Sequence, residues 1–217
     1  MTAPPAPDPN AALLTTVRRR ALFGIRSALV LTVAALPLSF VTNVALGRIS
    51  PEVLGTYGAI QILIGTSFTF LVFGGANVFT RFVPALPDEE RFAFLGSYAV
   101  AVLGVFVTLA VLAALLPGWT RLFLSQFGAP PPALALAVLA ASVVVGMAGW
   151  YLYAVSEATW AVLVEKSVIL GFFVAAGVGF LTLRAELARG DASFLWEAAL
   201  AVYLASAFAA PRTRACA

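Results

Sequence analysis

Four long stretches of the chain carry no charged residue. They are Ser27–Gly47, Val53–Thr80, Phe92–Thr120 and Leu122–Ser156. A helix needs roughly 20 apolar residues to cross the hydrocarbon core of a bilayer, where it satisfies its own backbone polar groups. Each stretch is long enough to do so. The pattern therefore predicts an all-α protein, a polytopic membrane helical bundle.

We predict about six transmembrane helices in this bundle, the sixth of which carries a charged residue, Glu197. The six spans run from about Leu22 to Leu46, Val53 to Val83, Phe92 to Leu116, Pro132 to Tyr153, Trp160 to Leu183 and Ala192 to Ala210. The segment 1–20 is rich in proline and arginine and is predicted to be a disordered basic cytoplasmic tail. The segment 21–211 is the six-helix transmembrane bundle, and 212–217 is a short cytoplasmic tail.

Arginines orient the predicted bundle. Cytoplasmic loops of membrane proteins carry an excess of Lys and Arg. With the N-terminus inside, the inner side holds Arg18, Arg19, Arg20, Arg81, Arg91, Arg212 and Arg214, and the outer side holds Arg48, Arg121, Arg184 and Arg189. The bias predicts a multi-pass protein of the inner (cytoplasmic) membrane with both termini in the cytoplasm. Aromatic residues near the span ends are predicted to lie at the membrane interfaces: Trp119, Trp150, Tyr151, Tyr153 and Trp196.

Composition narrows the classes of function. The chain is 62% hydrophobic and 11% charged, with a mean hydropathy of +1.00, whereas soluble domains are about 45–50% apolar and about 25% charged. The net charge of +3 follows from arginines at span ends, so we expect no nucleic-acid partner. There is no His, and the only Cys is Cys216, next to the last residue. We therefore predict no metal site, no cofactor and no enzymatic activity.

The second predicted span carries a polar stripe. Six of its residues fall within an arc of about 100° on a continuous helix: Thr66, Ser67, Phe70, Gly74, Asn77 and Arg81. A polar stripe on an apolar span is expected to face protein or water rather than lipid. Alternatively, the hydroxyls bond to the preceding turn and the arginine anchors the inner end. We expect the stripe to face the protein interior, with Asn77 and Arg81 toward a cavity.

Other polar residues inside the spans have two readings each. Arg26 either extends back to the head groups or enters a cavity and holds an anionic group. Asn43 and Gln61 either line a cavity or form hydrogen bonds between helices. Glu165 and Glu197 are candidates for binding a coupling proton or cation, and the alternative is that each is a helix-end charge at the interface.

The connection between the first two spans resembles a known family. It reads Leu46-Gly-Arg-Ile-Ser-Pro-Glu-Val-Leu-Gly-Thr-Tyr-Gly58. An Arg, then Ser-Pro-Glu, then Gly-x-Tyr at the start of the second helix is similar to the N-terminal signature of polysaccharide and O-antigen flippases. These belong to the multidrug/oligosaccharidyl-lipid/polysaccharide exporter superfamily. The resemblance continues through Gly74–Arg81 and the acidic–basic loop Asp88–Arg91, and covers roughly Arg18–Arg121.

This resemblance implies one lobe of a two-lobe transporter, because family members consist of two six-helix lobes. It implies a flippase-like protein of polysaccharide biosynthesis and export that translocates lipid-linked oligosaccharide across the cytoplasmic membrane. We expect a truncated or half-size protein that pairs with a second lobe, through homodimerisation or a separate subunit. Its partners would be membrane lipid and the pyrophosphate head group, and its substrate cavity would be lined by Arg26, Asn43, Gln61, Asn77 and Arg81. The alternatives are a non-transporting assembly or anchoring subunit, and a drug or cation exporter lobe of the same superfamily.

Overall fold

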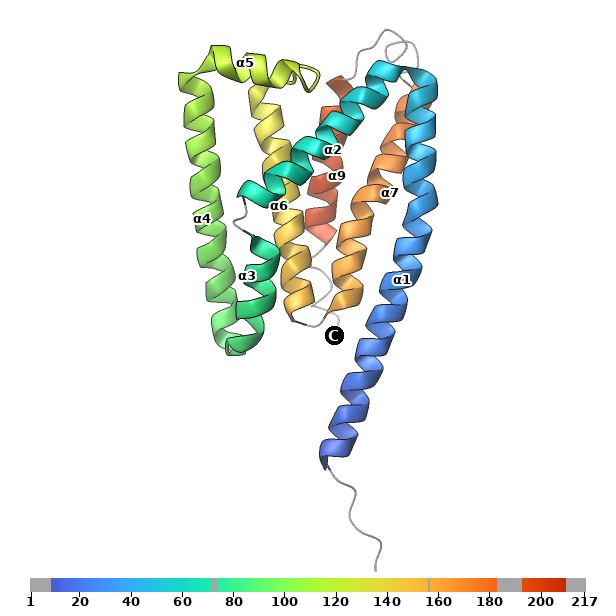
Figure 1. Cartoon of the computed structure of the whole chain (residues 1–217), viewed down its shortest axis with the longest axis vertical. Coiled ribbons are helices and arrows are strands. Elements are labelled where there is room, and N and C mark those ends of the chain that lie inside the picture. The colour runs from blue at the N-terminus through green and yellow to red at the C-terminus, as the bar shows by residue number, and fades with distance from the viewer. Residues whose placement is uncertain (1–8, 72–73, 156, 183–192, 210–217) are drawn as a thin grey trace, which may run out of the picture.

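The computed structural model describes residues 9–71, 74–155, 157–182 and 193–209, and all regular structure in these ranges is helical (Figure 1). The elements are α1 (Pro9–Ile49), α2 (Pro51–Leu71), α3 (Gly75–Phe82), the 3-10 turn η1 (Val83–Ala85), α4 (Asp88–Leu115), α5 (Pro117–Ser125), α6 (Pro132–Ala154), α7 (Ala158–Thr182) and α9 (Ser193–Ala209). The predicted all-α helical bundle is confirmed.

Four of the described helices are long and apolar enough to cross a membrane. They are Leu22–Ile49 within α1, Asp88–Leu115, Pro132–Ala154 and Thr159–Gly179. A shorter apolar helix, Phe194–Phe208, lies within α9. A multi-pass membrane protein accounts for this set of helices.

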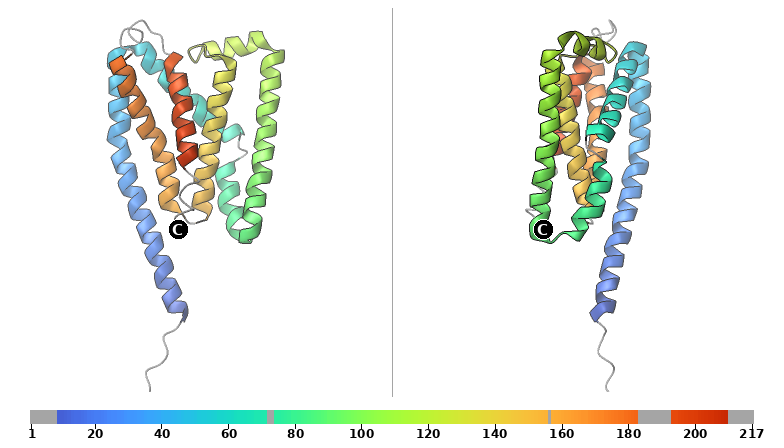
Figure 2. Two further views of the ribbon diagram at one scale, coloured as in Figure 1. Left: turned by 180° about the vertical axis from the view of Figure 1, so that it is seen from behind. Right: turned by 60° about the vertical axis from the view of Figure 1, so that its left-hand side comes forward.

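The described helices pass back and forth between two ends of the bundle (Figures 1 and 2). We call them the α5 end, where α5 lies across the bundle, and the α3–α4 end, where α3 turns into α4. The helices α1, α4 and α7 run toward the α5 end, and α2 with α3, α6 and α9 run away from it. The six predicted spans fall on these passes, but the second is not one helix, and the described part of the sixth, α9, has 17 residues and is not among the helices long enough to cross a membrane.

The second span breaks at a glycine pair. The sequence predicts one helix over Val53–Val83, but α2 ends at Leu71 and α3 begins at Gly75. Gly74 adopts φ 69° and ψ 31°, the left-handed conformation that glycine takes at little cost and other residues avoid. The helix α2 crosses α6 obliquely, and α3 then runs beside α6 (Figure 1). The prediction of a continuous second helix is wrong.

Helix α1 begins earlier than the sequence pattern predicts. It already includes residues 9–20, which belong to the predicted disordered tail. The segment Ala11-Ala12-Leu13-Leu14 consists of the two strongest helix-forming residue types, and it continues directly into the first apolar run. Helical propensity thus extends α1 beyond the membrane-spanning part.

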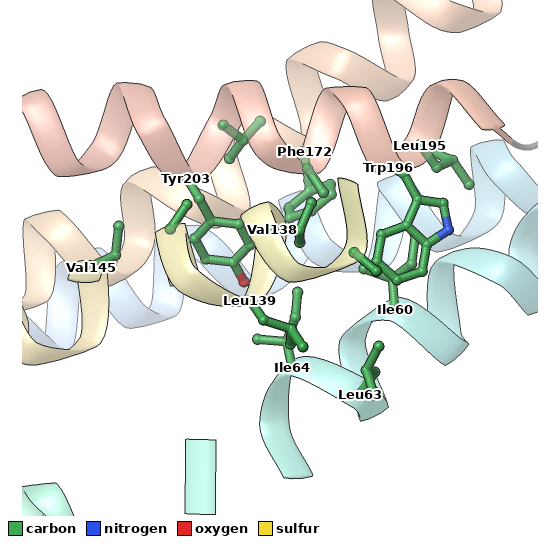
Figure 3. Close-up of a cluster of buried hydrophobic side chains, with 14 of the residues drawn as sticks. Ile60, Leu63, Ile64, Val138, Leu139, Val145, Phe172, Leu195, Trp196 and Tyr203 are labelled. Carbon is green, nitrogen blue, oxygen red and sulfur yellow. The ribbon is translucent and has the colours of Figure 1, made fainter. Parts of the chain in front are cut away.

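Helix α6 lies at the centre of the core. It packs against α7 and α9 along its length and against α3 near the α3–α4 end. Figure 3 shows Trp196 and Tyr203 pointing from α9 toward residues of α6 and α2. The Trp196 side chain is fully buried, and its Nε1–H donates to the Phe127 carbonyl at 3.1 Å. The prediction that Trp196 is an interfacial aromatic is therefore wrong.

Small and hydroxylated residues mediate the contacts of α7. A Cβ atom built on Gly171 would lie 2.6 Å from Val202 Cγ1 of α9, and one on Gly179 would lie 2.5 Å from the Phe194 ring. Two hydroxyl pairs join α7 to its neighbours: Ser167 to Ser206 on α9 at 2.8 Å, and Thr159 to Ser27 on α1 at 2.8 Å. Close approach through small residues and interhelical hydrogen bonds are typical of membrane helix packing.

Helices α4 and α5 form the periphery. Only 6% of the residues in the most apolar part of α4 are buried within the chain. Most of the apolar surface of α4 is therefore available to lipid. The short helix α5 lies across one end of the bundle, roughly perpendicular to α4 and α6 (Figure 1). Its Trp119 side chain is 73% exposed, as expected for an aromatic residue at a membrane interface. The sequence pattern did not predict α5.

Candidate functional site

The two candidate residues on α1 lie outside its contact with α7. The buried positions of α1 include Gly24, Ala35 and Thr42. Arg26 is exposed and lies about 200° around the helix from Gly24, hence on the opposite face. Asn43 is also exposed. Neither side chain has an ion pair or side-chain hydrogen bond within the part of the chain that the structure describes.

Asn77 and Arg81 lie on the outer face of α3. Phe79 is fully buried between α6 and α4, with its ring 5.0 Å from that of Tyr98. Asn77 and Arg81 lie two residues before and two residues after Phe79, so both project from the face of α3 opposite Phe79. Both side chains are exposed. The Arg81 guanidinium lies 5.9 Å from the Phe82 ring centroid and forms no ion pair with any described residue. Our expectation that both point toward a cavity inside the bundle is not met within this chain.

The remaining members of the predicted stripe differ in their exposure to solvent. Thr66, Phe70 and Gly74 are exposed, whereas Ser67 is half-buried. Gln61 is half-buried, and its side chain hydrogen-bonds to Tyr57, one turn earlier on α2. The expectation that the stripe faces the interior is therefore wrong for this chain taken alone, because the break at Gly74 and the tilt of α2 leave most of it on the surface. We refer to Arg26, Asn43, Thr66, Asn77 and Arg81 as the exposed polar set of α1–α3.

An apolar cavity of about 430 Å³ lies between α2, α4, α5 and α6. Its side chains are aliphatic and aromatic apart from the hydroxyls of Ser67 and Thr120. The Thr120 hydroxyl donates to the Leu116 carbonyl at 3.0 Å. The lining suits hydrocarbon and offers few partners to a sugar or a phosphate. None of the predicted substrate-binding residues lines it.

A second cavity, of about 270 Å³, lies between α6, α7 and α9 and contains the predicted coupling residue Glu165. Ser142 and Tyr153 of α6 and Tyr203 of α9 also line this Glu165 cavity. The Ser142 hydroxyl donates to the Leu139 carbonyl at 2.8 Å. Four residues that carry a carboxylate or a hydroxyl thus line one small cavity from three helices.

Glu165 pairs with its neighbour in sequence. The Lys166 ammonium lies 2.6 Å from Glu165 Oε1, and Lys166 is the only lysine of the chain. The Lys166 side chain is 20% exposed and that of Glu165 is 55% exposed. Both belong to the span Thr159–Gly179. Glu165 lies seven residues after the start of α7, roughly 10 Å along the helix axis.

Glu197, the other predicted coupling residue, lies elsewhere. It is exposed in the second turn of α9, it lines neither cavity, and it forms no ion pair with a described residue. The structure therefore brings Glu165 into a cavity and leaves Glu197 on the surface near the α5 end.

Two segments that carry the family resemblance have structural roles. Ser50 caps α2, since its hydroxyl oxygen accepts from the Glu52 backbone N–H at 3.1 Å. The same hydroxyl hydrogen-bonds to the Glu52 carboxylate, which lowers the pKa of Glu52. In the α3–α4 connection, Arg91 Nε donates to the carbonyls of Val83 and Leu86, each at 3.1 Å, and its guanidinium pairs with Asp88. A helix cap and a closed loop account for these residues without any ligand.

Sequence reasoning missed Ser142, Tyr153 and Tyr203 as neighbours of Glu165. Ser142 and Tyr153 lie in one stretch of the sequence, Glu165 in a second and Tyr203 in a third, all in mostly apolar surroundings, and neither spacing nor periodicity relates α6 and α9 to α7. Only the packing of the three helices brings these residues together. The one available signal was that each hydroxyl lies in a predicted span, where polar groups require partners.

Comparisons with protein-family models, with curated proteins and with solved structures find no match to this chain.

Proposed function

We propose that this chain is one lobe of a flippase-like transporter that moves lipid-linked oligosaccharide across the cytoplasmic membrane. The exposed polar set of α1–α3 is the observation that carries the proposal. Arg26, Asn43 and Thr66 lie on helices that pass through the membrane, yet they face away from the interior of the chain. Arg26 lies about one turn into the span Leu22–Ile49, and Asn43 and Thr66 lie further along their helices; polar residues within membrane spans typically face protein or a water-filled cavity rather than lipid. A second lobe that encloses a wet cavity with these residues would supply that environment.

The chemistry of the exposed polar set suits such a substrate. A lipid-linked oligosaccharide has a pyrophosphate and many hydroxyls, whose transfer into hydrocarbon without partners costs several kcal/mol for each group. The planar guanidinium of Arg binds phosphate through paired, charge-assisted hydrogen bonds. Arg26 and Arg81 would bind the pyrophosphate, while Asn43 and Asn77 would bind sugar hydroxyls.

The distribution of cations supports an orientation for this lobe. Arg26, Arg81 and Arg91 lie toward the α3–α4 end, where the arginine-bearing start of α1 also lies, whereas Arg48 and Arg121 lie at the α5 end. Because cytoplasmic ends of spans carry the excess of cations, we place the α3–α4 end in the cytoplasm. Arg26 and Arg81 would then meet a substrate in the cytoplasmic leaflet.

Complementation of a flippase-deficient strain tests the proposal. Wild type should restore export, and Arg26→Ala and Arg81→Ala should each reduce it, because both remove a phosphate ligand. Arg121→Ala is the matched control, an exposed cation at the opposite end of the bundle, and it should export normally. Expression and membrane insertion of each variant are measured in parallel.

The oligomeric state in detergent separates this proposal from its alternatives. We expect the exporting form to contain a second copy or a separate subunit. Full export by a monomeric chain that is indifferent to both Arg substitutions would contradict the proposal. Absence of export, together with loss of another membrane complex when the gene is deleted, would instead support an assembly or anchoring subunit.

A further inference from the structure

The apolar cavity between α2, α4, α5 and α6 requires a hydrocarbon filler. The described side chains leave about 430 Å³ of it unfilled, and an empty cavity destabilises a protein in proportion to its volume. Water is a poor filler, because apolar cavities stay dry and a buried water needs about three polar partners. The lining contains two hydroxyls, and that of Thr120 already donates to the Leu116 carbonyl.

Two walls of this cavity are single faces of membrane helices. The α4 wall consists of Leu109, Leu112, Ala113 and Leu116, which follow the spacing i, i+3, i+4 and i+7 of one helical face. The α6 wall follows the same spacing from Pro132 to Leu139. Each wall extends over seven residues, roughly 10 Å along its helix axis. The cavity is therefore long in the direction of the spans.

Helix α5 closes one end of the cavity. Its residues Trp119, Thr120, Phe123 and Leu124 belong to the lining, and the exposed Trp119 is typical of a membrane interface. The cavity thus begins near the level of the lipid head groups and runs inward from there. The hydrocarbon of one leaflet is about 15 Å deep, so the cavity lies within a single leaflet. A phospholipid acyl chain has the same direction and starts at the same depth.

The cavity lies where α4 and α6 are not packed together. Nearer the α3–α4 end, α4 packs on α6 through a cluster that includes Val102, whereas toward the α5 end its residues face the cavity. Leu112 and Leu116 of α4 are about half-exposed, while Ala135 and Leu139 of α6 are buried. The cavity is therefore open to the bilayer beside α4 and reaches the interior of the bundle beside α6.

We propose that this cavity binds one acyl chain of a membrane phospholipid, which remains with the protein and is not a transported substrate. The chain enters beside α4 from the leaflet at the α5 end. It contacts both α4 and α6 and replaces the side-chain packing that joins these helices nearer the α3–α4 end. None of the exposed polar set of α1–α3 lines the cavity, so the inference does not depend on the proposed transport function.

Photo-crosslinking in proteoliposomes tests the site. The full protein is reconstituted in phosphatidylethanolamine and phosphatidylglycerol with a trace of phosphatidylcholine that carries a diazirine in one acyl chain. Bulk lipid reaches Leu103 on the exposed surface of α4, but only a chain inside the cavity reaches Ala135 and Leu139. We expect adducts at both kinds of position in the wild type. Adducts confined to the exposed surface of α4 would overturn the proposal, whether a second copy of the chain fills the cavity or nothing does.

Two adjacent alanines of α4 provide a matched pair of variants. Ala113 lines the cavity, whereas Ala114 is exposed and outside the lining. Ala113→Trp should fill the cavity and remove the adducts at Ala135 and Leu139, and Ala114→Trp should keep them. Undiminished inner adducts in Ala113→Trp would contradict the assignment. The map of the wild type stands on its own if a variant fails to fold, which size-exclusion profiles establish.

Native mass spectrometry in mild detergent identifies the occupant. We expect one phospholipid to be retained by the wild type and by Ala114→Trp, and none by Ala113→Trp. A retained free fatty acid, or no retained lipid in the wild type, would overturn the proposal. Neither readout requires transport, so a failure here is distinguishable from a failure of the proposed function.

Discussion

The close contact between α7 and α9 makes Gly171→Ala a sensitive perturbation. A Cβ atom at position 171 would lie 2.6 Å from Val202 Cγ1 and 2.9 Å from Cγ2. These distances are about 1 Å shorter than the roughly 3.5–4.0 Å optimum for carbon contacts. Val202 cannot relieve the overlap by rotating, because a β-branched side chain in a helix has one strongly preferred χ1 rotamer. The helices must therefore separate locally.

Two effects set the expected magnitude. Overpacking by one methyl group in a tight core typically costs about 1–3 kcal/mol. Replacement of Gly by Ala in a helix interior contributes roughly 0.8–1 kcal/mol in the opposite direction. A Cβ atom on Gly177 of the same helix would meet no other atom within 4 Å, so Gly177→Ala gains the second effect alone. We expect Gly171→Ala to be less stable than Gly177→Ala by about 1–3 kcal/mol.

Equilibrium unfolding in mixed micelles, followed by far-ultraviolet circular dichroism, measures this difference. The double variant Gly171→Ala/Val202→Ala adds a rescue arm, because it removes both Cγ atoms that the new methyl group meets. Its free energy of unfolding should be higher than the sum of the two single effects predicts. Equal stability of Gly171→Ala and Gly177→Ala, with no coupling to Val202, would refute the close packing of α9 against α7.

Two further predictions concern contacts at the α5 end. Ser50→Ala should destabilise the protein by about 1 kcal/mol through loss of the α2 cap, while Ser125→Ala, on the exposed surface of α5, should be neutral in the same unfolding assay. The hydrogen bond to Ser50 lowers the pKa of Glu52 in the folded state. The stability that this bond adds is therefore present at pH values above the unfolded-state pKa of Glu52, and it is lost as the pH falls through the folded-state pKa of Glu52. The stability difference between wild type and Ser50→Ala should accordingly narrow in acid, and a difference that widens would contradict this sign. Trp196→Phe leaves the Phe127 carbonyl without its donor and should lower the free energy of unfolding by about 1 kcal/mol or more. The control Trp119→Phe, at an exposed position, should leave the free energy of unfolding unchanged. Equal effects of the two substitutions would show that the hydrogen bond of Trp196 contributes nothing to stability.

The sequence predicted the bundle well because span length and hydropathy are local properties. The absence of charge over Phe92–Thr120 and Leu122–Ser156 was enough to predict α4 and α6. The break at Gly74 was not predicted, because a glycine pair is compatible with a continuous membrane helix, and the left-handed conformation at Gly74 depends on how α2 and α3 pack.

The candidate site was less predictable than the fold. Glu165 was identified as a candidate from its charge alone, but its cavity depends on Tyr153 and Tyr203, which approach from other helices. The polar stripe of the second span was derived for one straight helix. Because that segment is tilted and broken into α2 and α3, the stripe does not face the protein interior as the sequence predicted. A cavity that residues of several helices line cannot be predicted from the sequence periodicity of one helix, because it depends on how the helices pack.

The proposed function requires that the exposed polar set face a water-filled cavity shared with a second lobe rather than lipid. Thiol labelling at Thr66 tests this most directly, because Thr66 is exposed and lies about midway between the start of α2 and the end of α3. In a Cys216→Ala background, Thr66→Cys is compared with Leu103→Cys, a position in the α4 span whose side chain is 61% exposed. We expect a membrane-impermeant thiol reagent to label position 66 in native membranes and to leave position 103 unlabelled. Equal protection of both positions would place Thr66 against lipid and contradict the shared cavity.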